Sequence, residues 1–415
     1  MTGKKQLKAR IRARMAKTGE SYTAARRHLV GPAEPPRDGD WVFHGGRDPR
    51  SAVVSALTGL PEPLVFLAGG GIGAGYILWE FKRHEAVHLT LGFSHLWQYH
   101  DRWMTGTLER LGVPFDHHET SGAKGAAARL AAELAAGRPC VVLPDRYGAG
   151  YWRLPEFLDG HGGHPVIAYG TAGDVAKGGM VKLDDRGTAP VLVPADRLAA
   201  ARGRVPSYRN CLFVLGQAPD GGARLAPAVR EGLRACVTQL SGGSDSFALP
   251  AWRKWSRTLT DARAAKGWPR VFENGRGLAG ALLSVWEGVE PVGLDGGNLR
   301  DLFADGLDLA APLLGEPRLG EAAAEFRRVH GLWHDLAEAA LPAERFGRIR
   351  ELTAAVRESV ASEGEAGEAE AAELWELRAA ADREPAGVDL AELGARLAAI
   401  HAAESGAIAR LGEIV

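Results

Sequence analysis

The order of apolar and polar positions divides the chain into a part with strands and helices and a later part with helices alone. Short runs rich in Val, Leu and Ile predict strands in the first part. These runs read "PLVFLA", "AVHLTLGF", "PCVVLP", "HPVIAYG", "GMVKLDD" and "NCLFVL". Apolar residues at helical spacing predict helices in "SAVVSALTG", "DRWMTGTLERLG" and "GAKGAAARLAAELAAG". The mixture indicates an α+β or α/β domain.

From about residue 226 the apolar positions follow helical spacing almost throughout. We therefore predict a basic arm and linker over 1–38, a mixed domain over 39–217 and a helical domain over 226–415. The acidic stretch near the C-terminus, from 361 to 387, is expected to form part of a helical hairpin that closes the bundle.

Composition and charge narrow the class of protein. The formal net charge is −1, so the chain as a whole is not built to bind polyanions, and its three cysteines are too few for a disulfide framework. No apolar run reaches the roughly 20 residues of a membrane span, and no apolar segment follows the basic N-terminus as in a secretory signal. We expect a cytoplasmic protein without a membrane partner. Abundant Ala, Arg and Gly indicate a GC-rich genome, such as that of an actinobacterium.

The N-terminal arm concentrates positive charge. Seven basic residues lie within its first 17 positions, namely Lys4, Lys5, Lys8, Arg10, Arg12, Arg14 and Lys17. Such a segment can bind RNA, an acidic carrier protein or another anionic partner. A solvated tail without a partner is the alternative.

The glycine-rich stretch "LAGGGIGAGYILWEF" raises the question of a phosphate-binding loop. A dinucleotide loop needs the spacing GxGxxG between a strand and a helix. Here the glycines give GxGxG, and a helix candidate precedes them. We therefore expect the glycines to permit close backbone packing, and we predict no cofactor.

Several long motifs resemble those of a known family. The segments "FLAGGGIGAGYILWEFKRH", "LTLGF", "WQYHDRW", "LDGHGGHPVIAYG" and "VKLDDRG" are similar to the N-terminal domain of the butirosin biosynthesis protein H group. The region from "SGGSDSFALPAWRKWSRTLTDARAAKGWPRVF" to "LLSVWEGVEP" resembles the helical domain of unknown function that often follows it. The resemblance extends over about 40–350.

The resemblance implies an α+β domain with a papain-like or C39-like cysteine-peptidase fold, followed by an all-α domain. It also implies acyl or aminoacyl transfer from an acyl carrier protein, or another acyl donor, to a small-molecule amine in specialised metabolism. In that fold a cysteine begins a central helix, a histidine opens a later strand, and an aspartate on the next strand orients the histidine.

Mapped onto this chain, His164 takes the place of the family histidine, and Asp184 or Asp185 that of the orienting acid. Strand alternation slightly favours Asp184. The stretch "FHGGRDPRSAVVSALTG", which matches the active-site helix, contains no cysteine. Pro49 or a neighbour occupies its position, and Ser51 is the nearest hydroxyl.

Candidate substrate-binding residues flank these positions. For most of them the alternative role is packing in the core. They are Gly70, Gly71, Gly73, Tyr76, Trp97, Tyr99, Asp145 and Tyr147. Asp145 stands at a strand end, where it could receive a cationic substrate. We predict no metal site, because the adjacent histidines of "FDHHET" would point to opposite faces of a strand.

Three interpretations stay open. In the first, the protein transfers acyl groups directly, with His164 as general base on the acceptor amine. In the second, it is an inactive member that binds a carrier or partner protein. In the third, Ser51 replaces the cysteine as nucleophile.

Overall fold

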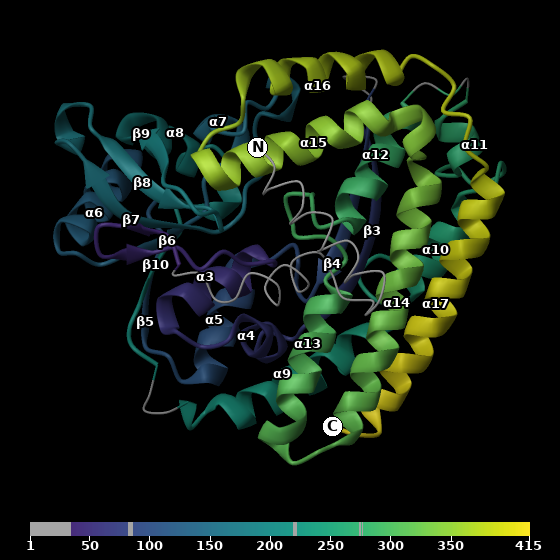
Figure 1. Cartoon of the computed structure of the whole chain (residues 1–415), viewed down its shortest axis with the longest axis horizontal. Coiled ribbons are helices and arrows are strands. Elements are labelled where there is room, and N and C mark those ends of the chain that lie inside the picture. Colours follow the sequence, from purple (N-terminus) through teal and green to yellow (C-terminus); the bar gives the residue numbers. More distant parts are fainter. Residues whose placement is uncertain (1–34, 82–85, 219–221, 274, 276) are drawn as a thin grey trace, which may run out of the picture.

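The computed structural model describes residues 35–81, 86–218, 222–273, 275 and 277–415. Within these residues a sheet-bearing N-terminal part precedes a series of helices (Figure 1), which confirms the mixed α+β class. The basic arm lies outside the described residues, so its binding to RNA or to a carrier stays a prediction.

The N-terminal part is built around an antiparallel sheet of six strands in the order β5-β10-β6-β7-β8-β9. The strands are β5 (Phe115–His118), β6 (Cys140–Val142), β7 (Val166–Ala172), β8 (Met180–Asp184), β9 (Val191–Pro194) and β10 (Leu212–Leu215). Four of them, β6, β7, β8 and β10, confirm predicted strands. A short pair, β1 (Arg37–Asp38) and β2 (Trp41–Val42), precedes the sheet.

Helices cover both faces of this sheet. They are α3 (Pro49–Thr58), α4 (Glu62–Ala68), α5 (His100–Leu111), α6 (Ala123–Ala135), α7 (Arg146–Ala149) and α8 (Ala195–Gly203). Apolar side chains of α3, α4 and α5 share a cluster with Val141 of β6, whereas those of α6 and α8 share another with Cys140 and Val142. The alternation along β6 thus sends its side chains into two different cores.

The strand predicted over 63–68 is wrong, because these residues form α4. Leu64 to Ala68 are all buried, so the run shows no polar face that would reveal its period. Pro63, in the first turn, suits a helix start.

The glycines after α4 lead into a separate hairpin of β3 (Ile72–Phe81) and β4 (Ala86–Ser94). A Cβ on Gly73 would lie 2.3 Å from the carbonyl oxygen of Ser94 on the partner strand. Gly70 has φ +99°, and a Cβ there would lie 2.5 Å from the His95 ring. These positions need glycine because backbone and side chains pass so close.

The later part is helical. It contains α9 (Leu225–Leu240), α10 (Pro250–Thr258), α11 (Trp268–Val271), α12 (Leu278–Val289), α13 (Arg300–Leu314), α14 (Arg318–Ala340), α15 (Ala343–Glu363), α16 (Glu368–Ala381) and α17 (Leu390–Gly412). The long helices α14 and α17 pack together, and α15 and α16 lie side by side across one end (Figure 1, top). The paired α15 and α16 match the expected hairpin.

The two parts share an extensive interface. Helix α4 packs on α9 and α13, while β3 contacts α10 and β4 contacts α12. At the other end, the turn after α15 reaches the sheet part, where Ala366 N donates to Tyr151 O at 2.8 Å. No single helix in the described ranges combines the length and apolar character of a membrane span.

Candidate functional site

A buried histidine–carboxylate pair lies where two neighbouring strands meet. His164 precedes β7 and is 2 % exposed, and its Nε2 lies 2.6 Å from Oδ1 of Asp185. Asp185 follows β8, whose last residue, Asp184, is paired with Ile167 of β7. The antiparallel pairing of β7 and β8 therefore brings the two side chains together.

The slight preference for Asp184 as the partner of His164 is wrong. Asp184 accepts hydrogen bonds from Trp41 Nε1 at 3.0 Å and from the backbone N of Arg186 at 2.9 Å. β8 ends at Asp184, and the chain then turns through Arg186, which has φ +59°. Strand alternation consequently does not extend to Asp185, the residue that reaches His164.

The other ring nitrogen of His164 contacts an arginine. Arg146, at the start of α7, donates from Nε to His164 Nδ1 at 2.7 Å. Its Nη2 lies 2.6 Å from Oδ1 of Asp295, from the loop between α12 and α13. Because a guanidinium only donates, Nδ1 must accept, and the ring proton must sit on Nε2 and point to Asp185.

These contacts define the charge state of the pair. Burial lowers the pKa of His164 to about 4, and the charge of Arg146 acts in the same direction, against Asp185. Burial alone would raise the pKa of Asp185, but His164 and Arg186 lower it well below its usual range. Tyr151 adds a hydrogen bond from its hydroxyl to Asp185 Oδ2 at 2.9 Å. At neutral pH the site holds a neutral imidazole beside a carboxylate.

Helix α3, which the resemblance matches to the active-site helix, lacks an activated nucleophile among its described side chains. Asp48 caps α3 by accepting from the backbone N of Ser51 at 2.8 Å, and Pro49 is the first helical residue. Ser51 is fully buried, and its hydroxyl partner within the described chain is Glu62, with Oγ and Oε1 3.4 Å apart, rather than His164. This geometry does not place Ser51 as a nucleophile.

None of the three cysteines supplies the missing nucleophile. Cys140, Cys211 and Cys236 are all buried. Burial raises the pKa of each thiol to about 12. A thiol becomes a good nucleophile only as the thiolate, so none is primed for attack.

A cavity of about 940 Å³ opens between the sheet part and the helices. Its wall is formed by β4, the segment 152–162, α12, α15 and α16. Arg146, Asp295 and Arg357 lie on this wall. Asp295 keeps 72 % of its side chain accessible, as expected for a group that faces open space. Through Arg146, the histidine–carboxylate pair is one contact away from the cavity.

The predicted substrate-binding residues are placed elsewhere. The described residues that line the cavity include none of Gly70, Gly71, Gly73, Tyr76, Trp97, Tyr99, Asp145 and Tyr147. Tyr76 is stacked on Trp255 in the core, and Trp97 packs where a Cβ on Gly75 would be. Asp145 is fully buried and caps α7. For these three residues core or cap roles replace ligand contact.

Sequence reasoning missed Arg146, Asp295 and Arg357. Arg146 follows the selected Asp145 directly, but nothing in "DRYGAGYW" distinguishes it from a surface arginine. Asp295 is 149 residues away from Arg146, so only the tertiary fold brings them together. The role of Arg146 beside His164 can therefore be recognised only from the tertiary structure.

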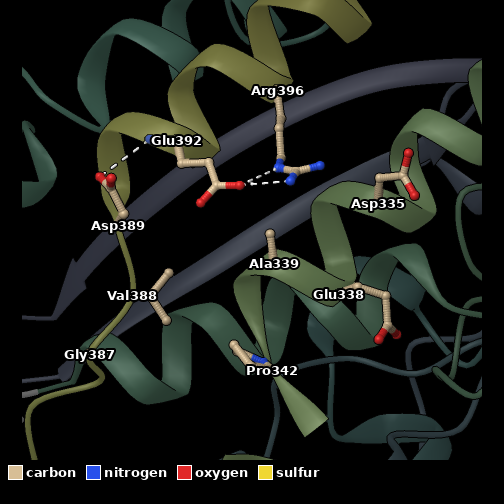
Figure 2. A pocket seen from close by; sticks show the side chains of 9 residues that line it. All are labelled: Asp335, Glu338, Ala339, Pro342, Gly387, Val388, Asp389, Glu392 and Arg396. Carbon is tan, nitrogen blue, oxygen red and sulfur yellow. Dashed lines mark hydrogen bonds and ion pairs between the residues drawn. The ribbon is translucent and has the colours of Figure 1, made fainter. Parts of the chain in front are cut away.

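A second depression, of about 500 Å³, lies between the end of α14 and the start of α17 (Figure 2). Its wall carries the exposed ion pair Glu392–Arg396. Glu338 on its rim could join Glu290 and His334 around a metal ion. However, both oxygens of Glu338 bind Arg350, and Glu290 binds His334 Nδ1 at 2.7 Å. These side chains already bind partners within the protein, so we propose no metal ion here.

Two family matches agree with the resemblance seen in the sequence. Residues 50–177 match the family described as butirosin biosynthesis protein H, N-terminal, and residues 196–369 match a domain of unknown function, DUF4872. A search of curated proteins finds no match. The first match contains His164 and Arg146, and the second contains Asp295 and Arg357. The chain therefore carries an N-terminal domain of the butirosin biosynthesis protein H family, followed by a DUF4872 domain.

Proposed function

We propose that this protein is a catalytically inactive member of its family that binds an acyl carrier or a partner protein together with a small-molecule group in its cavity. The observation that carries the proposal is the contact of Arg146 Nε with His164 Nδ1 at 2.7 Å. With Asp185 on Nε2, both ring nitrogens are engaged.

General-base catalysis needs a free lone pair and a pKa near the working pH. The lone pair on His164 Nδ1 accepts from Arg146, and the pKa of about 4 leaves the imidazole a weak base. A covalent route also lacks its nucleophile, because α3, which the resemblance matches to the active-site helix, begins at Pro49 and contains no cysteine. These features all favour binding without turnover.

Direct acyl transfer to an amine is the second candidate, and one observation favours it. The His164–Asp185 pair is intact and buried, and Arg146, which donates to His164, lines the cavity. If a bound substrate drew Arg146 away toward Asp295, Nδ1 would be released to accept a proton from the amine. The family match fits a transferase-like role in biosynthesis at this coarse level.

Mass spectrometry of intact proteins separates the two candidates. Acyl-carrier thioesters are incubated with a panel of primary amines and with wild type, His164→Ala, Ser51→Ala or Arg146→Met. We expect all four proteins to leave the carrier acylated at the rate of the enzyme-free blank, and none to acquire an acyl group. Stable association of wild type with the carrier, measured by calorimetry, is the expected positive result.

Two outcomes would overturn the binding proposal. Deacylation by wild type that His164→Ala abolishes would show His164 acting as a base. An acylated enzyme that disappears in Ser51→Ala would show a serine nucleophile. Arg146→Met serves as the informative control, because it frees His164 Nδ1 without removing the histidine.

A further inference from the structure

The cavity wall has more positive than negative side chains. Its lining includes five arginines, namely Arg146, Arg270, Arg357, Arg378 and Arg383, and four carboxylates, namely Glu273, Glu287, Asp295 and Asp382. In a partly buried site an uncompensated charge is costly. The excess positive charge therefore favours an anion in the cavity.

Of the three arginines near His164, Arg357 is the one without an ion pair in the described part of the chain. Arg146 binds Asp295, and Arg186 Nε lies 3.6 Å from Asp185 Oδ1. Arg357 Nη1 is buried and has no hydrogen-bond partner within the described part of the chain.

The Trp152 ring packs against Arg357 but offers its guanidinium no hydrogen-bond acceptor. Its guanidinium carbon lies 5.4 Å from the centre of the Trp152 ring, which also lines the cavity. Burial lowers the pKa of Arg357 to about 10, with the nearby charge of Arg186 in the same direction and Asp185 opposing it. Arg357 thus stays charged at neutral pH and gains from a ligand that brings a negative charge.

Apolar side chains form much of the rest of the cavity wall. This part of the wall includes Leu89, Leu91, Phe157, Leu283, Val356 and Leu374. The volume of about 940 Å³ falls near the upper end of ordinary small-molecule sites, roughly 300–1,000 Å³. The cavity thus combines charged groups with room for an apolar chain.

We propose that the cavity binds an anionic amphiphile, with a carboxylate at Arg357 and an apolar chain along β4, α12 and α16. A monovalent head group matches the single excess positive charge, and Asp295 on the same wall disfavours a dianion. This inference rests on the proposed binding function and adds the chemical class of the ligand.

Calorimetry with three probes of equal chain length tests the head group on the full-length wild type. The probes are n-decanoate, 1-decanol and decyltrimethylammonium. We expect decanoate to bind about tenfold more tightly than decanol, since a hydrogen bond to a charged group contributes at least that much. The cationic probe is expected to bind most weakly.

The variant Arg357→Met keeps an apolar stem against Trp152 and removes the charge. It is expected to weaken decanoate binding about tenfold and to leave decanol binding unchanged. Arg396→Met, which removes an exposed arginine that does not line the cavity, is the matched control and should leave decanoate binding as in wild type. Circular dichroism confirms that each variant is folded.

Equal affinity of wild type for decanoate and decanol would overturn the proposal, as would full decanoate affinity in folded Arg357→Met. Carrier association is measured on the same preparations. If the carrier binds but none of the three probes does, this inference fails while the proposed function stands. If the probes bind as expected but the carrier does not, the proposed function loses its macromolecular partner and the cavity assignment stands.

Discussion

Replacing Arg300 by leucine is expected to lower the free energy of unfolding by about 3–5 kcal/mol, which makes it one of the most damaging single changes. Arg300 and Glu404 are both fully buried, with Nε and Oε1 2.6 Å apart. The same guanidinium donates to the backbone oxygens of Gly73 and Phe93 in the β3–β4 hairpin. Glu404 also accepts from Trp252 Nε1 at 3.0 Å. The substitution leaves a buried carboxylate and three backbone oxygens, those of Gly73, Phe93 and Asn298, without this donor.

Urea unfolding followed by circular dichroism measures this effect. The double variant Arg300→Leu/Glu404→Leu removes the stranded charge, so its loss should be smaller than the sum of the two single losses. Arg396→Leu, which breaks an exposed pair with Glu392, is the matched control and should cost less than about 1 kcal/mol. A loss below about 1 kcal/mol for Arg300→Leu would show that the buried pair does not hold the hairpin to the helices.

Replacing His100 by leucine is expected to make the protein less sensitive to acid. Burial lowers the pKa of His100 from an ordinary 6.5 to about 3, helped mainly by the charge of Arg50. His100 Nδ1 has no hydrogen-bond partner among the described residues, so no hydrogen bond at this nitrogen offsets the cost of burying the imidazole. From pH 7 to pH 5, the free energy of unfolding of His100→Leu should rise relative to wild type by about 2 kcal/mol.

The sign follows from proton uptake. Below pH 6.5 the unfolded chain protonates His100, whereas the folded protein does not until about pH 3. Wild type therefore loses stability as the pH falls through this window, and the variant avoids that loss. His334 provides a control of opposite sign, because its hydrogen bond with Glu290 raises its pKa. The free energy of unfolding of His334→Gln should therefore fall relative to that of wild type as the pH falls. Parallel unfolding curves for wild type and His100→Leu would refute the burial of a neutral His100.

The sequence predicted the fold where the period of apolar residues is unambiguous. Strands β6, β7, β8 and β10 and the long helices each have one buried face or flanking turn residues. Helix α4 was mistaken for a strand because all of Leu64 to Ala68 are buried, which erases the period. The glycines after it pack closely against neighbouring backbone and side chains, as predicted from their spacing.

The site was predictable only in part. His164 and an acid after the next strand follow from motif order, and the pairing of β7 with β8 explains their contact. Strand alternation failed at Asp185 because β8 ends one residue earlier. Arg146, Asp295 and Arg357 escaped because their roles arise from contacts between distant segments, which no local pattern encodes.

The most direct measurement is the titration of His164 by nuclear magnetic resonance, using protein with ¹⁵N-labelled histidine. We expect a neutral ring protonated at Nε2, with a pKa near 4, and a higher pKa in Arg146→Met because that charge is removed. This result would support a site in which Arg146 and Asp185 occupy both nitrogens. A wild-type pKa at or above 6.5 that Arg146→Met leaves unchanged would contradict it, and would show a histidine free to act as a base.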